Sequence, residues 1–374
     1  MYPFKDDHVF LRDSWYVVAF PDELNTGPIE RTVMGERIAI FRMSDGTVSA
    51  MAGICPHRFY PLAQGKVIGD ALQCNYHGFQ FDGRTGACVK IPSQAATPKT
   101  FRQRIYPIVE HGPWIWLWPG NPVLADKSLL PPLNEIGVGA GWRVDHTGLL
   151  HVEARAQLLV DNLQDLTHVA FLHAVSVDGS SLVGNDVTYR DEGRVVRSMR
   201  RGRSEWVDGF YDLLFKPENR FEGLHHSDTG CWFFSPGYMT TFSGFITDID
   251  SKASVDPAIY GNYYFHHILT PETAHSTHYF STTSRNYRLD DDELSRTMVG
   301  LDRTVRMQDV VAVGLVERNL SSLPTKPSEL LCRADSAAAY IRRRMQAALD
   351  AEAANNHEPA ARAATSPQAA SAES

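Results

Sequence analysis

The chain has 374 residues, of which 43% are hydrophobic and 21% are charged, and its formal net charge is −8. This composition is typical of a soluble globular protein with room for two domains, and the negative charge argues against a nucleic acid partner. No apolar run approaches the roughly 18–20 residues of a membrane span, and the N-terminus has no apolar signal core. We therefore expect neither membrane insertion nor export.

The five cysteines are too few and too scattered for a disulfide framework. Cys55 and Cys74 belong to a motif described below, and Cys88, Cys231 and Cys332 are expected to be small buried hydrophobic residues. Unpaired thiols are typical of a reducing compartment. The cysteine pattern therefore predicts a cytoplasmic protein.

The first third of the chain alternates strand-like runs with turn residues. The runs lie at residues 15–20, 37–42, 79–81 and 114–118, and turn signals such as Asp82-Gly83 follow them. The three tryptophans of the last run are expected to pack in and around the core. The pattern predicts a small antiparallel β domain over residues 1–125.

Two short loops of this domain carry paired metal-ligand residues. The first is Cys55-x-His57 and the second, sixteen residues later, is Cys74-x-x-His77. Two thiolates and two imidazoles are the ligand set of a Rieske [2Fe–2S] centre, in which the cysteines hold one iron and the histidines the other. A structural Cys₂His₂ zinc site uses the same atoms. Zinc fingers, however, group Cys with Cys and His with His, so this arrangement favours the two-iron cluster.

The remainder of the chain is expected to form a second domain over residues 126–349, after a proline- and glycine-rich linker at 122–142. Residues 350–374 are expected to be a disordered tail, unless their alanine-rich start extends the preceding helix. No nicotinamide, flavin or nucleotide-phosphate motif is present. The electrons must therefore come from another protein.

A second group of candidate ligands lies in residues 158–173, where apolar residues recur at helical spacing. Two histidines and a distant carboxylate make the facial triad of non-haem iron oxygenases. A lone histidine on an apolar helix is usually a core residue, but here two histidines accompany two aspartates downstream of a redox cluster. The polar residues of the segment are Asp161, Asn162, Asp165, His168 and His173.

The pattern Asp161-x₃-Asp165-x₂-His168-x₄-His173 resembles the iron motif of the Rieske non-haem iron oxygenases, and residues 55–77 resemble their cluster motif. The similarity extends over residues 10–345 or so. The segments DSWYVVAFPDEL and HILTPET are most similar to the aromatic O-demethylases typified by vanillate and dicamba monooxygenases. The resemblance implies an α+β fold, in which a helix-grip (START-like) catalytic domain with a curved antiparallel sheet follows the antiparallel β Rieske domain.

The same resemblance implies a third iron ligand, an aspartate on a late helix. Residues 293–319 have the periodicity of a long helix, in which Leu301, Val305, Val313 and Val316 form an apolar stripe. Asp309 falls within that stripe, where a carboxylate is costly unless it meets a cation or strong donors. Asp302 lies beside two arginines and is expected to be solvated. Asp309 is therefore the predicted ligand, and the alternative is a carboxylate in an interface ion pair.

Further roles follow from the resemblance. Asp165 is implied to link His77 of the partner subunit to His168, which implies a ring-shaped homo-oligomer, most simply a trimer. Asn162 is placed near the iron without binding it. A substrate-contacting histidine precedes ILTPET in the subgroup, which points to His267 on a hairpin of residues 263–283. An NAD(P)H-dependent reductase or a ferredoxin is the implied electron donor.

The implied activity is that of a terminal oxygenase that uses O₂ to demethylate a methoxylated aromatic acid and releases formaldehyde. Ring hydroxylation, cis-dihydroxylation, N-demethylation or methyl hydroxylation of another aromatic compound would use the same iron site. A Rieske electron carrier would need no second iron site, and a metal-stabilised structural protein is a remaining alternative. The basic run Arg197, Arg200, Arg201 and Arg203 fits either a solvated strand face or a docking site for an acidic donor.

Overall fold

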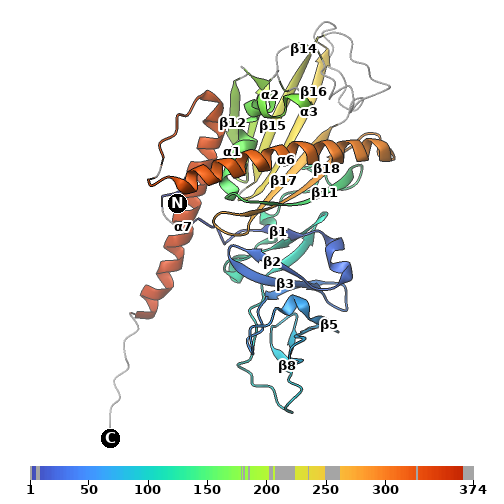
Figure 1. Ribbon diagram of the computed structural model, residues 1–374, viewed down its shortest axis with the longest axis vertical. Coiled ribbons are helices and arrows are strands. Elements are labelled where there is room, and N and C mark those ends of the chain that lie inside the picture. Colours follow the sequence, from blue (N-terminus) through green and yellow to red (C-terminus); the bar gives the residue numbers. More distant parts are fainter. Residues whose placement is uncertain are drawn as a thin grey trace.

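The computed structural model describes residues 2–364 with short gaps at 6–8, 178, 180–181, 184–185, 202–204, 235 and 326 and longer ones at 207–223 and 249–261. No helix in this described part of the chain combines the length and the hydropathy needed to cross a bilayer. The fold is α+β, with small antiparallel sheets followed by one large antiparallel sheet and long helices. Figure 1 shows the two parts stacked end to end.

The N-terminal part contains three small sheets, as the strand-like runs predict. One has the order β1-β10-β9, one has the order β2-β3-β4, and the third has the order β5-β6-β7-β8. The strands are β1 (Tyr16–Ala19), β2 (Ile29–Val33), β3 (Glu36–Arg42), β4 (Val48–Ala52), β5 (Lys66–Ile68), β6 (Ala71–Gln73), β7 (Gln80–Asp82), β8 (Cys88–Lys90), β9 (Ile108–His111) and β10 (Trp114–Leu117).

The C-terminal part is built on an eight-stranded antiparallel sheet. Its order is β11-β18-β17-β16-β15-β13-β12, and β14 pairs with β15. Its strands are β11 (Arg143–Val152), β12 (Val187–Asp191), β13 (Val195–Arg201), β14 (Glu205–Trp206), β15 (Leu224–Phe234), β16 (Tyr238–Asp248), β17 (Tyr263–Pro271) and β18 (Thr277–Arg285). The helices are α1 (Ala156–Gln164), α2 (Val169–Leu172), α3 (Ala174–Val177), α6 (Asp292–Ser322) and α7 (Ser336–Ala364).

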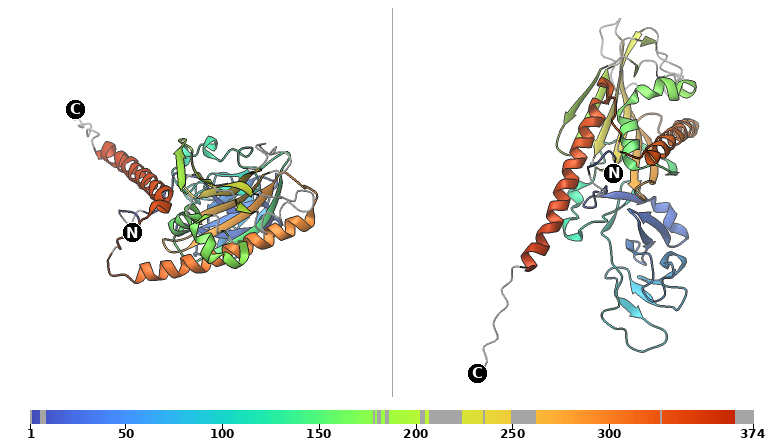
Figure 2. Two further views of the ribbon diagram at one scale, coloured as in Figure 1. Left: turned by 90° about the horizontal axis from the view of Figure 1, so that it is seen from above. Right: turned by 60° about the vertical axis from the view of Figure 1, so that its left-hand side comes forward.

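The two parts share a hydrophobic core. Trp114, Trp116 and Trp118 are buried, as expected, and they belong to one cluster with Tyr238 and Phe280 of the large sheet. Backbone bonds reinforce the contact, since the Met34 amide donates to the Pro271 carbonyl at 2.8 Å. The large sheet is therefore covered by the N-terminal part on one side, and α6 crosses its other face (Figures 1 and 2).

Helix α6 buries a face of mixed polarity, and this confirms the expected apolar stripe only in part, since Val313 is buried but Leu301 and Val305 are only partly buried. Asp302, Arg306, Asp309 and Glu317 are all buried among its inward residues, whereas Val316 is exposed. Asp302 was expected to be solvated, but it is 4% exposed because it pairs with Arg306 at 2.9 Å. The helix thus brings charged groups into the layer between itself and the sheet.

Helix α7 agrees with the alternative for the tail, in which the alanine-rich start extends the preceding helix, and not with disorder from residue 350. It continues to Ala364, past position 350, and runs along the side of the molecule (Figure 2). Glu352 is buried, and its carboxylate accepts hydrogen bonds from the amides of Arg12 and Asp13 at 3.1 and 2.7 Å. Residues 365–374 lie outside the described residues. Of the three remaining cysteines, Cys88 and Cys231 are buried as expected, but Cys332 is exposed and that prediction is wrong.

Candidate metal centres

The two predicted cluster loops have the same backbone geometry. The Cys55 amide donates to the Tyr60 carbonyl, and the Cys74 amide donates to Phe79 in the same way. The fourth residue after each cysteine has a positive φ, which is 58° at Phe59 and 74° at Gly78. Glycine adopts this conformation freely, whereas phenylalanine is strained there. Two equivalent loops suit a cluster that each loop grips by one thiolate and one imidazole.

The loops place the four candidate ligands together at one end of the molecule. The thiols of Cys55 and Cys74 are buried, while His57 and His77 lie at the surface with ring centroids 4.5 Å apart. Phe79 stacks on His57 at 4.5 Å. The histidine side of this site is therefore the side that another protein chain can approach.

The second centre brings together His168, His173 and Asp309. The Nε2 atoms of the two histidines lie 3.4 and 3.1 Å from Oδ1 of Asp309, and one ligand atom from each residue fits within 4.8 Å of the others. Burial alone would raise the pKa of Asp309, yet the two histidines lower that pKa below its usual range. The carboxylate is therefore anionic where it meets the imidazoles.

The tautomers of both histidines are set by the groups behind them. Nδ1 of His168 donates to the main-chain carbonyl of Asp165 at 2.6 Å, and Nδ1 of His173 donates to the Gln308 side chain at 2.7 Å. Both Nε2 atoms are then the ring atoms that face Asp309. Without a metal a proton can bridge His173 and Asp309, and burial, which would lower the pKa of His173, is accordingly outweighed by Asp309, which raises that pKa. With both Nε2 atoms deprotonated, two imidazole nitrogens and one carboxylate oxygen would offer three converging lone pairs, a ligand set that fits a divalent iron.

The chain reaches this geometry by breaking a helix. The apolar spacing predicts a helix through residues 158–173, but α1 ends at Gln164, and Asp165 is its C-cap with φ −108° and ψ 91°. The Asp165 carboxylate accepts from the Thr167 amide at 3.0 Å, a local bond that competes with helix continuation. The break allows His168, one short turn later, and His173, after α2, to face α6.

Asn162 and His267 occupy different positions relative to the iron ligands. The Asn162 side chain donates to Oδ1 of Asp309 at 2.9 Å, so it holds the carboxylate. His267 lies on the sheet face toward α6, where its ring nitrogens bond to the hydroxyls of Tyr279 and Thr241. Burial, reinforced by Arg306, lowers the pKa of His267 to about 3, so the ring is neutral. A direct substrate contact at His267 stays a prediction.

The Asp165 carboxylate is not in contact with His168 within one chain. The contact to His168 comes from the Asp165 main chain, whereas the carboxylate pairs with Arg200 at 3.0 Å. Arg200 is 2% exposed, and Arg197 pairs with Glu192 and lies over Trp232. Arg200 is therefore structural, contrary to a solvated or docking face, whereas Arg197 stays partly exposed. The Arg201 side chain and Arg203 lie outside the described residues.

Sequence reasoning missed Gln308, which precedes the predicted ligand Asp309 on α6. Its side chain accepts from His173 and also donates to the Ser176 hydroxyl at 3.2 Å. A partly buried glutamine beside a ligand has no distinctive pattern in the sequence. Only the fold shows that it orients a histidine.

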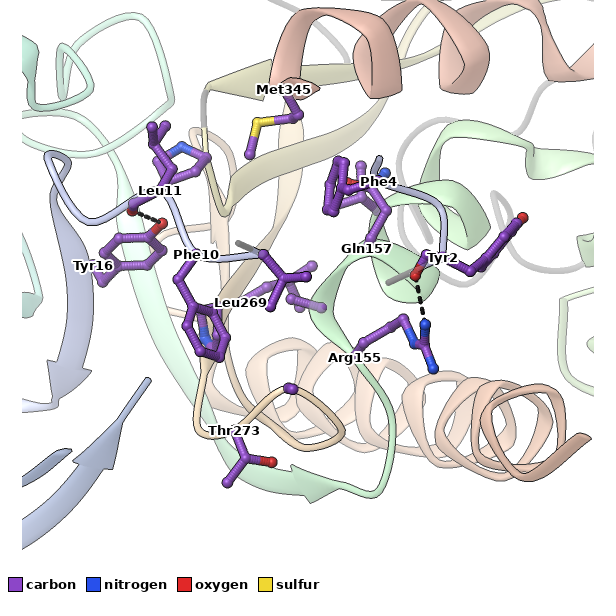
Figure 3. Close-up of a pocket in the computed structure, with 16 residues that line it drawn as sticks. Tyr2, Phe4, Phe10, Leu11, Tyr16, Arg155, Gln157, Leu269, Thr273 and Met345 are labelled. Atoms are coloured by element: carbon purple, nitrogen blue, oxygen red, sulfur yellow. Dashed lines mark hydrogen bonds between the residues drawn. The ribbon is translucent and has the colours of Figure 1, made fainter. Parts of the chain in front are cut away.

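A small cavity of about 50 Å³ lies elsewhere, between the N-terminal segment, α1, β17 and α7 (Figure 3). Its walls are mostly apolar and include Phe4, Phe10 and Met345, and none of the iron ligands lines it. Arg155 beside it donates to the Tyr2 carbonyl. We regard this cavity as part of the contact between the N-terminal segment and the C-terminal part.

Comparison with known proteins agrees with this geometry. The Rieske [2Fe-2S] domain family matches residues 14–107, and the Vanillate O-demethylase oxygenase C-terminal domain family matches residues 152–351. The chain is 32% identical over 371 residues to the oxygenase component of dicamba O-demethylase from Stenotrophomonas maltophilia, covering 92% of this chain and 99% of that one. It is also 32% identical over 359 residues to the oxygenase component of chloroacetanilide N-alkylformylase from Rhizorhabdus wittichii, covering 92% and 97%.

The crystal structure of dicamba monooxygenase bound to dicamba has the same fold, with a TM-score of 0.78 and 30% identity, and the match covers 92% of this chain and 99% of that one. The chain therefore belongs to the Rieske non-haem iron oxygenases. Its catalytic domain is of the vanillate O-demethylase type, and its cofactors are a Rieske [2Fe–2S] cluster and a mononuclear iron at His168, His173 and Asp309.

Proposed function

We propose that this chain is the terminal oxygenase of a multicomponent O-demethylase whose substrate is a methoxylated aromatic acid. The observation that carries the proposal is the two-histidine, one-carboxylate site in a catalytic domain of the vanillate O-demethylase type. Similarity to a dicamba O-demethylase over nearly the whole of both chains supports the same substrate chemistry. An NAD(P)H-dependent reductase, a ferredoxin or both would supply the electrons.

The overall reaction would convert the methyl ether, O₂, two electrons and two protons into a phenol, formaldehyde and water. When bound, the iron supplies O₂ activation and the cluster supplies electrons one at a time. The chain's own residues position these centres. Asp165 and Gln308 orient the two histidines, and Asn162 fixes the Asp309 carboxylate. Cys55, His57, Cys74 and His77 are the proposed ligands of the cluster.

The oligomer we propose is a head-to-tail trimer. The β5–β8 sheet beside the cluster loops and the helices α2 and α3 beside the iron lie at opposite ends of the chain (Figure 1). A partner subunit would place its cluster nearer to this iron. Both ends expose large apolar side chains, Phe59 and Tyr76 at the cluster and Phe171 and Val175 at the iron. In this assembly Asp165 would be the contact for His77 of the partner subunit.

Substitution of Phe59 tests this assembly. Phe59 is 77% exposed and strained, which is costly unless a partner covers it. Phe59→Asp is expected to convert the trimer to monomers, because aspartate tolerates the positive φ but is charged. Light scattering coupled to size exclusion measures the mass. Val123→Asp changes a similarly exposed side chain elsewhere and should leave the trimer intact. An unchanged mass for Phe59→Asp would rule out the proposed contact.

N-dealkylation is the second candidate function, and the similarity to the chloroacetanilide N-alkylformylase favours it. Oxidation of a carbon attached to nitrogen requires the same iron site, so only the substrate separates the two reactions. The test is a panel of methoxylated aromatic acids and N-alkylated anilides, offered to the iron-replete protein with an artificial reductant. Formaldehyde and a phenol in equal amounts from an acid support O-demethylation. Turnover of the anilides alone would overturn it.

A further inference from the structure

Arg306 is a buried cation whose hydrogen-bonding capacity is largely unused. It is 1% exposed, and its Nε donates to Asp302 at 2.9 Å. Its terminal nitrogens, Nη1 and Nη2, are both buried and have no hydrogen-bond partner among the described residues. A buried donor without a partner is costly, and a guanidinium more so. This arrangement needs an explanation.

A second buried arginine between α6 and the sheet shows what a purely structural arginine looks like here. Arg285 is fully buried, and its Nη1 donates to Asp145 at 3.0 Å and to Ser295 at 2.9 Å. Its Nη2 donates to the carbonyls of Arg288 and Asp291. Both terminal nitrogens of Arg285 are therefore satisfied within the chain. Arg306 differs because Nε is its only guanidinium nitrogen with a hydrogen-bond partner among the described residues.

Arg306 lies on the iron side of this layer. It is one turn before the ligand Asp309 on α6, and residues three apart share a helix face. Its guanidinium carbon lies 5.2 Å from the centre of the Tyr279 ring, and Tyr279 bonds to His267. Thr283 lies four residues after Tyr279 on β18 and therefore on the same face of the sheet. Its hydroxyl also has no partner among the described residues. The unused donors therefore belong to the face that contains the proposed substrate residue.

We propose that the terminal nitrogens of Arg306 bind the anionic oxygens of the aromatic substrate and make the enzyme selective for aromatic anions. The inference rests on the proposed function, because it assigns a recognition residue to that site. The two nitrogens form a planar fork that matches a carboxylate with two parallel hydrogen bonds. Asp302 orients the guanidinium through Nε and makes no hydrogen bond to the two terminal nitrogens. A sulfonate offers the same oxygens, so carboxylate and sulfonate are the two sources of the chemistry.

The test measures binding to the iron-replete holoprotein by calorimetry. The probes are 4-methoxybenzoate, 4-methoxybenzenesulfonate and the neutral 4-methoxybenzamide. Arg306→Gln is expected to weaken benzoate binding at least about thirtyfold, because truncating one partner of a buried charge pair has effects of that size. Binding of the benzamide should change less than about threefold. Arg306→Lys keeps the charge but loses the planar pair of terminal nitrogens, so its loss of benzoate affinity should lie between those of the wild type and Arg306→Gln. This variant also preserves the test if Arg306→Gln does not fold.

The matched control is Arg285→Gln, which removes a buried arginine of the same layer. It should lower thermal stability without changing the ratio of benzoate to benzamide affinity. Equal losses for both probes in Arg306→Gln, or no binding preference for either anion in the wild type, would overturn the inference. A preference for the sulfonate that depends on Arg306 would support it and assign the substrate to that class. Arg306-dependent benzoate binding without formaldehyde release would refute the proposed function and leave the inference standing.

Discussion

Asp309→Ala is expected to abolish turnover and to remove the mononuclear iron while the cluster remains. Asp309 supplies the only carboxylate of the ligand group, and both histidine Nε2 atoms face it at 3.1 and 3.4 Å. Loss of groups that merely orient a metal ligand costs about 10–100-fold, so loss of a ligand should cost more. Metal analysis should show one iron fewer per chain, and the visible spectrum of the cluster should be unchanged.

Asp302→Asn is the control for that substitution. Asp302 lies two turns earlier on the same face of α6 and is equally buried, but it bonds to Arg306 and Ser281 and not to a histidine. It should keep the full iron content. If Asp309→Ala retains all its iron, or if Asp302→Asn loses as much, the ligand assignment is wrong.

Arg155→Ala is expected to produce the largest loss of stability. Arg155 and Glu317 form a buried pair in which Nε and Nη2 each donate at 2.6 Å. Removing the Arg155 side chain leaves a buried carboxylate that keeps only its bonds to His275, Ser321 and the amide of residue 155, and breaking a buried pair in this way costs about 3–5 kcal/mol. The substitution also removes the bond to the Tyr2 carbonyl, shown in Figure 3, so the N-terminal segment should detach with it. Thermal and denaturant unfolding measure the loss.

The comparison variant is Arg84→Ala. Arg84 pairs with Asp45, but both side chains are more than two-fifths exposed, and such pairs contribute about 0–1 kcal/mol. Its unfolding midpoint should stay close to that of the wild type. A loss in Arg155→Ala no greater than that in Arg84→Ala would contradict the structural role given to the buried pair.

The same pair predicts a dependence of stability on pH. Burial alone would raise the pKa of Glu317, but hydrogen bonds from Arg155 and His275 hold that pKa at about 2. A depressed folded-state pKa stabilises the protein above the unfolded value of about 4.3 and loses that effect as the pH falls. The wild type should therefore lose stability between about pH 5 and pH 2. Glu317→Gln should show a smaller change over that range, measured by the unfolding midpoint.

The iron ligands were predictable because their signals are local. His168 and His173 stand five residues apart in the sequence, and Asp309 lies within a long helical pattern. The family resemblance implied an aspartate on a late helix, and the apolar stripe then selected Asp309 over Asp302, although Asp302 is buried and not solvated as expected. The assignment of His168 and His173 as ligands did not require a continuous helix over residues 158–173. The helix break at Asp165 therefore did not affect that assignment. The break itself was missed because a side-chain bond to Thr167, which periodicity does not reveal, ends α1.

The inward face of α6 was predicted only in part, with Val313 buried as expected, and the reason is physical. Hydrophobic periodicity identifies a buried face only when that face is apolar. In α6 the buried positions Asp302, Arg306, Asp309 and Glu317 are compensated by ion pairs and by the metal centre. Meanwhile Met307, Val311 and Leu315 form an exposed apolar stripe at intervals of four residues. The charged residues have helical spacing themselves, which is the signal that reveals the inner face.

Single turnover with ¹⁸O₂ tests the central claim most directly. The reduced, iron-replete protein would receive one equivalent of a methoxylated aromatic acid, and mass spectrometry would follow the phenol and formaldehyde. Hydroxylation of the methyl group predicts equal amounts of both products and a phenol that retains its original, unlabelled oxygen. A phenol carrying ¹⁸O would mean that oxygen attacks the ring, and this would contradict the proposed O-demethylation.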